Sequence, residues 1–277
     1  MPELPEVENV RSGLLPLLGS EFEITWFSNY PKYSSIAAAS GRLESLERRG
    51  KWLIFTLSKE PGFLLDLVVH LGMTGRLTLA AEKPEGDHLH ALWHLQAPDG
   101  SQSWLAFFDP RRFGKLACVP HKKYASLPGL HTLGPEATDP SSSTTKLLAL
   151  RGSSRSIKSA LLDQSVLAGV GNIYCDESLF AAKIHPATPC SKISEQQYRS
   201  LAAALADLLS ASIREGGTTF RDYRRPDGSS GSNAELLRCY GRSSLPCLVC
   251  GTLLRSTTVA GRSTVFCASC QAHPDES

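Results

Sequence analysis

The chain has 277 residues, 42% hydrophobic and 20% charged, which is enough to bury the cores of about two domains and excludes a disordered tail or a small disulfide-stabilised scaffold. No apolar run reaches the roughly 20 residues that span a bilayer, and the acidic, proline-containing N-terminus is unlike a signal peptide, so we expect a soluble cytoplasmic protein with no membrane partner. The net charge of +2 is distributed unevenly along the chain. Residues 1–150 carry 15 Lys and Arg against 16 Asp and Glu, whereas residues 221–270 carry seven Arg against three acidic residues. This excess favours a polyanionic partner or a solvated arginine-rich loop.

The first half of the chain predicts a leading helix followed by an antiparallel β-sandwich over residues 2–130. Apolar residues at helical spacing predict a helix over residues 5–18, which Pro16 would end early. Short strand-like runs separated by turn residues follow, and several strands at this spacing favour a sandwich or barrel. The runs are Phe22–Phe27, Trp52–Leu57, Phe63–Val69, Leu89–Gln96, Ser103–Phe108 and Lys115–Val119.

The second half predicts helices and then a small cysteine-rich module, which makes the whole chain an α+β protein. Residues 131–145 are rich in Pro, Ser and Thr and are interpreted as a linker. Residues 146–240 form the helical region. Its polar, Gly- and Ser-rich part at 217–238 is predicted to be a loop long enough to be functional. Residues 241–277 form the cysteine-rich module and a tail. The predicted helices are Thr144–Arg151, Ser156–Gln164, Ile173–Lys183 and Ser194–Glu215.

Four of the eight cysteines, Cys247, Cys250, Cys267 and Cys270, follow the pattern C-x2-C-x16-C-x2-C. Disulfides are rare in a reducing cell, so two such pairs favour one tetrahedral zinc site over two redox pairs. A four-sulfur shell has no open coordination position, so this zinc would be structural. The pattern therefore predicts a zinc ribbon with one bound Zn²⁺.

Two further segments carry chemistry. Removal of Met1 would leave Pro2 with a secondary amine, and α-amino groups titrate near 7.7–8.0, so part of the amine is unprotonated and nucleophilic at neutral pH. A proline that simply begins a helix is the alternative. In Leu167–Glu177 a Gly-Val-Gly turn precedes a helix opened by Asn172, and the amides of a helix N-terminus form a phosphate site.

These segments, taken together, resemble the bacterial formamidopyrimidine-DNA glycosylase (Fpg) family, from residue 2 to about residue 271. The resemblance implies a helix–two-turn–helix in the helical region, with loop 217–238, here called the lesion loop, around an extruded base. The matching segments, in order, are Pro2–Glu8, Arg49–Lys51, His70–Gly75, Asp109–Gly114, Leu167–Glu177 and the cysteine module with Gly261 and Arg262.

The resemblance implies a bifunctional DNA glycosylase and abasic-site lyase that excises oxidised purines, such as 8-oxoguanine and formamidopyrimidines, from double-stranded DNA. It assigns Pro2 as the nucleophile that forms an imine and Glu3 as the general acid–base at the deoxyribose. Lys51 would contact phosphates and assist elimination, and Arg262 would reach the backbone beside the lesion. Glu6 is left open between a direct and a structural role.

The resemblance also assigns DNA-binding residues. Met73, Arg111 and Phe113 would fill the space left by the flipped nucleotide, because apolar wedges between base steps offset unstacking. Lys158 and Asn172 would contact phosphates. Arg112 is interpreted as a salt-bridge partner.

The sequence departs from the family at 231–234, Gly-Ser-Asn-Ala, where relatives often carry an aromatic residue, so the lesion preference is open. One alternative is an endonuclease VIII-like enzyme for oxidised pyrimidines, although Leu4 favours the purine enzyme. The other is a zinc-ribbon protein that binds damaged DNA without catalysis. We expect a monomer located at the bacterial nucleoid.

Overall fold

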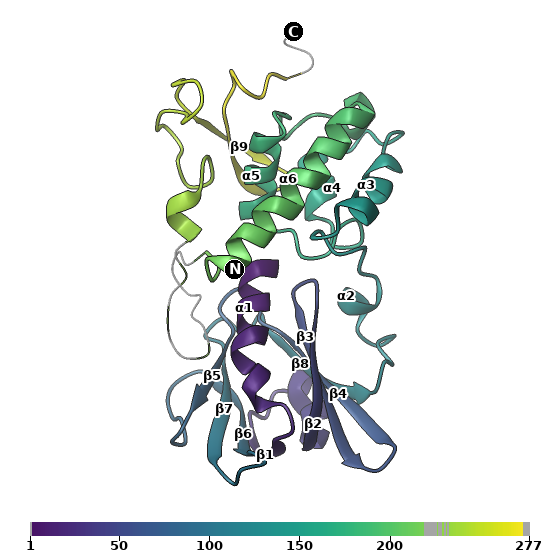
Figure 1. The fold of residues 1–277 in the computed structure, drawn as a ribbon, viewed down its shortest axis with the longest axis vertical. Coiled ribbons are helices and arrows are strands. Elements are labelled where there is room, and N and C mark those ends of the chain that lie inside the picture. The colour runs from purple at the N-terminus through teal and green to yellow at the C-terminus, as the bar shows by residue number, and fades with distance from the viewer. Residues whose placement is uncertain (1, 219–225, 227–228, 230, 232, 274–277) are drawn as a thin grey trace. The chain divides into compact units, whose positions relative to one another are not determined.

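The computed structural model of the protein describes residues 2–218, 226, 229, 231 and 233–273 (Figure 1). The chain divides into two compact units, one formed by residues 1–131 and 216–232 and the other by residues 132–215 and 233–277. Half of the predicted lesion loop lies outside the described residues, including Ser232 of the segment that departs from the family. Among the described residues, no helix combines the length and apolarity needed to cross a membrane.

The first unit is an antiparallel sheet preceded by a helix. Its eight strands lie in the order β5-β7-β6-β1-β2-β3-β4-β8, all pairs being antiparallel. The strands are β1 (Glu21–Phe27), β2 (Gly41–Arg49), β3 (Trp52–Glu60), β4 (Phe63–His70), β5 (Arg76–Ala80), β6 (Leu89–Gln96), β7 (Gln102–Phe108) and β8 (Lys115–Pro120). The helical segments are α1 (Leu4–Leu14), η1 (Leu15–Leu17), η2 (Pro31–Ala38) and α2 (Pro128–His131).

The sheet bends into two four-stranded halves because β1 and β2 pair at only two positions, Glu21 with Arg42 and Phe22 with Gly41. Figure 1 shows these halves diverging on either side of α1. One buried cluster joins side chains of α1, such as Val7 and Val10, to both halves of the sheet. The predicted antiparallel sandwich with a leading helix is therefore confirmed.

Two strands of this sheet were not predicted, for identifiable reasons. In β2 a bulge between Leu43 and Ser45 shifts the register, so the buried Leu43 and Leu46 stand three residues apart and break the alternation that indicates a strand. β5 has only five residues. The leading helix ends at Leu14, early as Pro16 predicts, and continues as a short 3-10 turn that contains Pro16.

The second unit contains four α-helices and a two-stranded hairpin among its described residues. Its elements are α3 (Pro140–Leu148), α4 (Ile157–Leu162), α5 (Asn172–Ala181), η3 (Cys190–Lys192), α6 (Glu195–Arg214), η4 (Asn233–Leu236), β9 (Arg255–Val259) and β10 (Arg262–Phe266). The α3 helix begins four residues before the predicted Thr144, because Asp139 caps it through the amides of Ser141 and Ser142 and Pro140 occupies its first turn. Ser194 caps α6, as predicted.

A buried aspartate fixes one edge of the sheet in the first unit. Asp66 on β4 is fully buried and accepts hydrogen bonds from Thr56 Oγ1 (2.9 Å), His121 Nδ1 (2.9 Å), the Lys122 amide (2.8 Å) and the Tyr124 hydroxyl (2.7 Å). Burial alone would raise the pKa of Asp66, but these hydrogen bonds outweigh burial and lower it.

We predict that Asp66→Asn lowers the free energy of unfolding by about 2–4 kcal/mol at pH 7. The substitution replaces an accepting oxygen by an NH2 group, which then faces other hydrogen-bond donors. Folding lowers the pKa of Asp66. The stabilisation is therefore present above the pKa of the unfolded chain, about 3.9, and is lost as the pH falls through the lower pKa of the folded protein. All four tryptophans lie in residues 1–131, so urea unfolding followed by tryptophan fluorescence measures this unit. The exposed Asp87→Asn is the matched control, and equal stability of the two variants would contradict the prediction.

Candidate functional site

The start of α1 holds two buried carboxylates directly after Pro2. Glu3 is 2% exposed and caps the helix by accepting the Glu6 amide, and Glu6, 1% exposed, accepts the Glu3 amide through Oε2 at 2.8 Å. The second oxygen of Glu6 accepts the Thr218 amide at 2.7 Å, which ties the start of the lesion loop to α1. Pro2 is buried, and Met1 lies outside the described residues. Glu6 therefore has a structural role in organising this end of the helix.

Lys51 lies where sequence reasoning placed it, at the entrance of β3. It follows Gly50, whose φ of 55° is left-handed, in the tight turn that pairs Arg49 with Trp52. The side chain of Lys51 is 6% exposed. The turn therefore places a buried lysine at the start of β3, next to the end of β4.

His70 is a buried residue near Lys51 to which sequence reasoning gave no role. It ends β4 opposite Trp52, and its Nδ1 accepts the Gly72 amide at 3.0 Å. Burial, with the nearby charges of Lys51 and Lys115, lowers the pKa of His70 to about 4, so the ring is neutral at pH 7 and carries its proton on Nε2. The residue opens the His70–Gly75 segment, but only the pairing of β3 with β4 brings its donor near Lys51.

Two turns bring Met73, Arg111 and Phe113 together. The buried Asp109 accepts Thr74 Oγ1 and the Gly114 amide, both at 2.6 Å, while Thr74 Oγ1 accepts the Arg111 amide at 3.3 Å. Gly72 has a φ of 64°, and a Cβ there would stand 2.6 Å from the Gly114 nitrogen, so the turns are in backbone contact.

Phe113 is 52% exposed, with the Arg111 guanidinium 4.7 Å from the centre of its ring. The two turns therefore expose an apolar and cationic projection. Arg112 is not a salt-bridge partner within the described part of the chain, contrary to our interpretation, because its guanidinium lies 5.0 Å from the centre of the Tyr30 ring and bonds the Tyr30 hydroxyl.

In the second unit, Lys158 and Asn172 both hold β10. Lys158 is completely buried, and its Nζ lies 2.5 Å from Asp176 Oδ1 and 3.1 Å from the Ser263 carbonyl oxygen. Asn172 Nδ2 donates to the same carbonyl at 2.9 Å, and Asp176 Oδ2 accepts the Val265 amide at 3.0 Å. The direct phosphate contact expected of Lys158 does not fit this burial, and the structure gives Lys158 a role in positioning β10.

Arg262 is exposed at the first position of β10, next to this network. The turn before it consists of Ala260 and Gly261, with φ values of 52° and 69°, as in the type I′ turns of two-residue hairpins. The pKa of Asp176 is raised to about 6 because burial outweighs the attraction of Lys158. Asp176 is a second residue that sequence reasoning missed, since its partners come from two other elements, α4 and β10.

Glu177, beside Asp176 on α5, fixes the chain that enters the cysteine module. Its carboxylate accepts the amides of Arg238 (2.9 Å), Cys239 (2.9 Å) and Tyr240 (2.8 Å), and its side chain is buried. A carboxylate that satisfies three successive amides orders the segment without regular secondary structure. Sequence reasoning quoted Glu177 but gave it no role.

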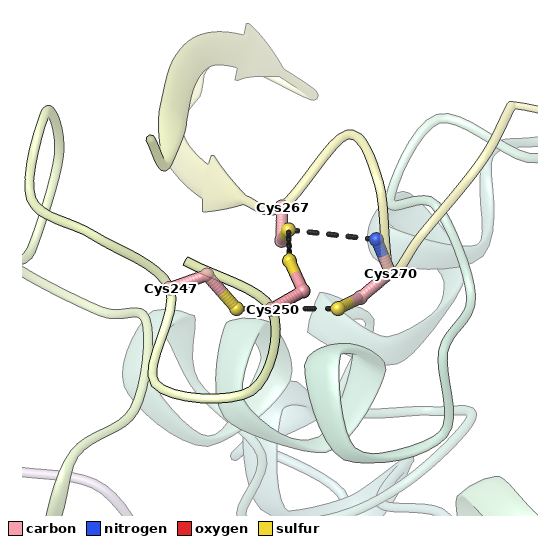
Figure 2. A group of neighbouring side chains, drawn as sticks. All are labelled: Cys247, Cys250, Cys267 and Cys270. Atoms are coloured by element: carbon pink, nitrogen blue, oxygen red, sulfur yellow. Dashed lines mark hydrogen bonds between the residues drawn. The ribbon is translucent and has the colours of Figure 1, made fainter. Parts of the chain in front are cut away.

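The four cysteines converge as predicted (Figure 2). Their sulfurs all lie within 4.8 Å of one another, with Cys247–Cys270 at 3.9 Å and Cys250–Cys267 at 3.5 Å. Zn–S bonds of about 2.3 Å in a tetrahedron place sulfurs roughly 3.8 Å apart, so the cluster fits one zinc ion. Among the described residues, no other group of His, Cys, Asp and Glu side chains could hold a metal.

Three family models match this chain in order. The formamidopyrimidine-DNA glycosylase N-terminal domain matches residues 1–116, the H2TH domain of the same glycosylase matches residues 133–224, and a zinc finger found in FPG and IleRS matches residues 244–272. The formamidopyrimidine-DNA glycosylase of Thermus thermophilus is 41% identical over 276 residues, 98% of each chain, and that of Desulforamulus reducens is 39% identical over 282 residues, 98% of this chain and 99% of the relative.

The chain belongs to the formamidopyrimidine-DNA glycosylase family. The crystal structure of Thermus thermophilus MutM (Fpg) superposes with a TM-score of 0.85 at 38% identity, covering 98% of this chain and 99% of that one. A Lactococcus lactis Fpg variant in complex with Fapy-dG-containing DNA gives 0.84 at 30% identity, covering 98% and 100%. The protein is an Fpg-type DNA glycosylase of base excision repair with a zinc finger, which confirms the predicted family, fold class and cofactor.

We predict that Lys158→Met destabilises the second unit by about 3–5 kcal/mol, because it leaves the Asp176 carboxylate buried without its cation. Calorimetric unfolding measures this change. The double variant Lys158→Met, Asp176→Leu should recover much of the stability, since apolar pairs replace buried ion pairs well. A double variant as unstable as the single one would contradict the assignment.

We predict that Cys267→Ser removes the zinc and weakens binding to duplex DNA, because the ribbon that carries Arg262 loses its fold. Native mass spectrometry should find one zinc per wild-type chain and none in the variant. The urea transition of the tryptophans should not move, since all four lie in the first unit. Cys118→Ser, also in the first unit, is the control that keeps zinc; loss of zinc from both variants would refute the assignment.

Proposed function

We propose that the protein excises oxidised purines, namely 8-oxoguanine and formamidopyrimidines, from double-stranded DNA and then cleaves the strand as an abasic-site lyase. The observation that carries this proposal is the start of α1, where the buried Pro2 directly precedes a capping box of two buried, hydrogen-bonded carboxylates, Glu3 and Glu6. Related Lactococcus lactis Fpg structures contain Fapy-dG and abasic-site DNA, which supports the same substrate class here.

The proposed reaction needs no cofactor at the reacting atoms. After removal of Met1, the Pro2 nitrogen attacks the anomeric carbon of the lesion, and the bond to the base breaks with its electron pair leaving on the base, which takes up the proton that the Pro2 nitrogen loses. Glu3 protonates the ring oxygen of the sugar as the ring opens, which leaves an iminium between Pro2 and the anomeric carbon. Loss of a proton from the adjacent carbon expels the 3′ phosphate, and a second elimination expels the 5′ phosphate.

Cationic and neutral donors bind the phosphates around this centre. Lys51 supplies an ammonium and His70 a neutral Nε2–H group, since the pKa of His70 is lowered to about 4 and the ring is uncharged at pH 7. Arg262 and the N-terminus of α5 at Asn172 supply donors from the second unit. Lys158, in this proposal, acts by holding the strand that carries Arg262.

Met73, Arg111 and Phe113 form the proposed wedge. The exposed Phe113 ring would replace the extruded base in the stack, and Arg111 would hydrogen-bond the orphaned partner base. We infer that the protein works as a monomer on chromosomal DNA in the nucleoid.

We predict that borohydride traps a covalent adduct between the protein and a duplex that contains 8-oxoguanine opposite cytosine, because hydride reduces the iminium to a stable amine. Peptide mass spectrometry should place the adduct on Pro2. Glu3→Gln should reduce excision at least about a hundredfold, as loss of a general acid–base does. Protein that retains Met1 should form no adduct.

The lesion panel separates the alternatives. Preferential trapping on thymine glycol would indicate an endonuclease VIII-like enzyme. Binding to damaged duplex with no adduct on any lesion would indicate a non-catalytic binding protein. Either result contradicts the proposal, as does an adduct located on Lys51.

A further inference from the structure

The turn that carries Arg111 and Phe113 is held by residues 80 or more positions earlier in the chain. Lys32, in η2, donates from Nζ to the Arg112 carbonyl oxygen at 2.6 Å and to the Gly114 carbonyl oxygen at 3.2 Å. An ammonium has three donors and no acceptor, so it suits two carbonyls that converge in a tight turn. Lys32 therefore joins the residues on both sides of Phe113.

Arg112 has a φ of 56°, in the left-handed region that a residue with a Cβ adopts only when its surroundings hold it there. Its side chain is held by Tyr30, whose ring lies 5.0 Å from the guanidinium and whose hydroxyl bonds Arg112 Nη1. Tyr30 is itself packed edge-on against Tyr33 (6.4 Å) and His90 (5.8 Å). The strained residue is thus fixed at its carbonyl by Lys32 and at its side chain by Tyr30.

The rest of the turn is anchored to the sheet. His90 on β6 is buried, and its Nε2 lies 3.1 Å from the Asp109 carbonyl oxygen. The Asp109 carboxylate holds the Gly114 amide from the other side of the turn. With both ends fixed, the dihedral angles of Arg112 decide the direction in which Phe113 leaves the turn.

We propose that Lys32 and Tyr30 are positioning residues that hold Arg112 left-handed and so pre-organise Phe113 and Arg111 as a rigid wedge for base extrusion. The proposal rests on the proposed function, since it concerns the wedge of that site. A pre-organised wedge loses no side-chain entropy when it enters the DNA stack. This favours the state in which Phe113 is inserted and the lesion is extruded over the state in which the lesion stays stacked and paired.

Base extrusion can be measured without any chemistry. A duplex with 2-aminopurine next to a non-hydrolysable 8-oxoguanine analogue becomes fluorescent when the lesion leaves the stack and a side chain takes its place. Lys32→Met and Tyr30→Phe should each slow this fluorescence change about tenfold, and the double variant more, while the affinity for undamaged duplex stays unchanged. Lys59→Met, an exposed lysine of the same unit, is the matched control.

A rescue separates positioning from a general structural defect. Glycine adopts a positive φ without strain, so Lys32→Met, Arg112→Gly should recover most of the insertion rate that Lys32→Met loses. Borohydride trapping on DNA with a preformed abasic site, which has no base to extrude, should be unchanged in all these variants.

Each outcome decides one proposal. Unchanged insertion in Lys32→Met and Tyr30→Phe, or no rescue by Arg112→Gly, would overturn the proposal that Lys32 and Tyr30 hold the wedge. Wild-type protein that gives no fluorescence change would overturn it as well, because there would be no wedge to position. Wild-type protein that inserts the wedge normally but forms no adduct would instead contradict the proposed lyase activity. The positioning role of Lys32 and Tyr30 would then stay supported.

Discussion

Buried carboxylates that accept backbone amides hold the functional segments of this protein in place. Glu6 accepts the amides of Glu3 and Thr218, Asp109 that of Gly114, Asp176 that of Val265, and Glu177 those of residues 238–240. Each bond satisfies a buried backbone amide that regular secondary structure leaves without a partner, at a helix start, in a turn or loop, or on one side of β10. Removing any of these carboxylates would leave buried donors unpaired, so the site geometry depends on them.

This arrangement also solves an electrostatic problem. A protein that binds the phosphate backbone needs exposed cations, and exposed carboxylates nearby would repel the ligand. Here the acidic side chains closest to the functional turns are buried and hydrogen-bonded to backbone amides, while Arg111 and Arg262 are exposed. A net charge of only +2 is therefore compatible with DNA binding, because the exposed charge differs from the total.

Two turns use left-handed backbone to project a side chain. Arg112 and the Ala260–Gly261 pair have positive φ values, and each directly precedes a residue with a proposed DNA contact, Phe113 and Arg262. The hairpin turn belongs to a small module whose apolar core consists of few residues around the cysteines, so zinc must supply the stability that apolar burial cannot. The wedge turn lies on a large sheet and is held by hydrogen bonds and by the contact of Arg112 with the Tyr30 ring.

The sequence by itself determined the family, the zinc site and the order of the elements, because those depend on local spacing: the two Cys pairs, the apolar alternation of the strands, and the short motifs. It placed Pro2, Glu3, Lys51 and Asn172 at the ends of the correct elements for the same reason. It missed β2, where a bulge breaks the alternation, and gave Lys158 a phosphate contact that its burial does not fit.

Only the tertiary structure decided the partners of the charged groups. Lys158 meets Asp176 and the Ser263 carbonyl, His70 lies near Lys51, and Lys32 caps a turn 80 residues away, and none of these pairs has a local signature. Burial then determines the role of each side chain, since desolvation and hydrogen bonding set its protonation state and the groups that it can contact. Residue type and spacing specify which chemistry is present, whereas long-range packing specifies which groups are exposed to use it.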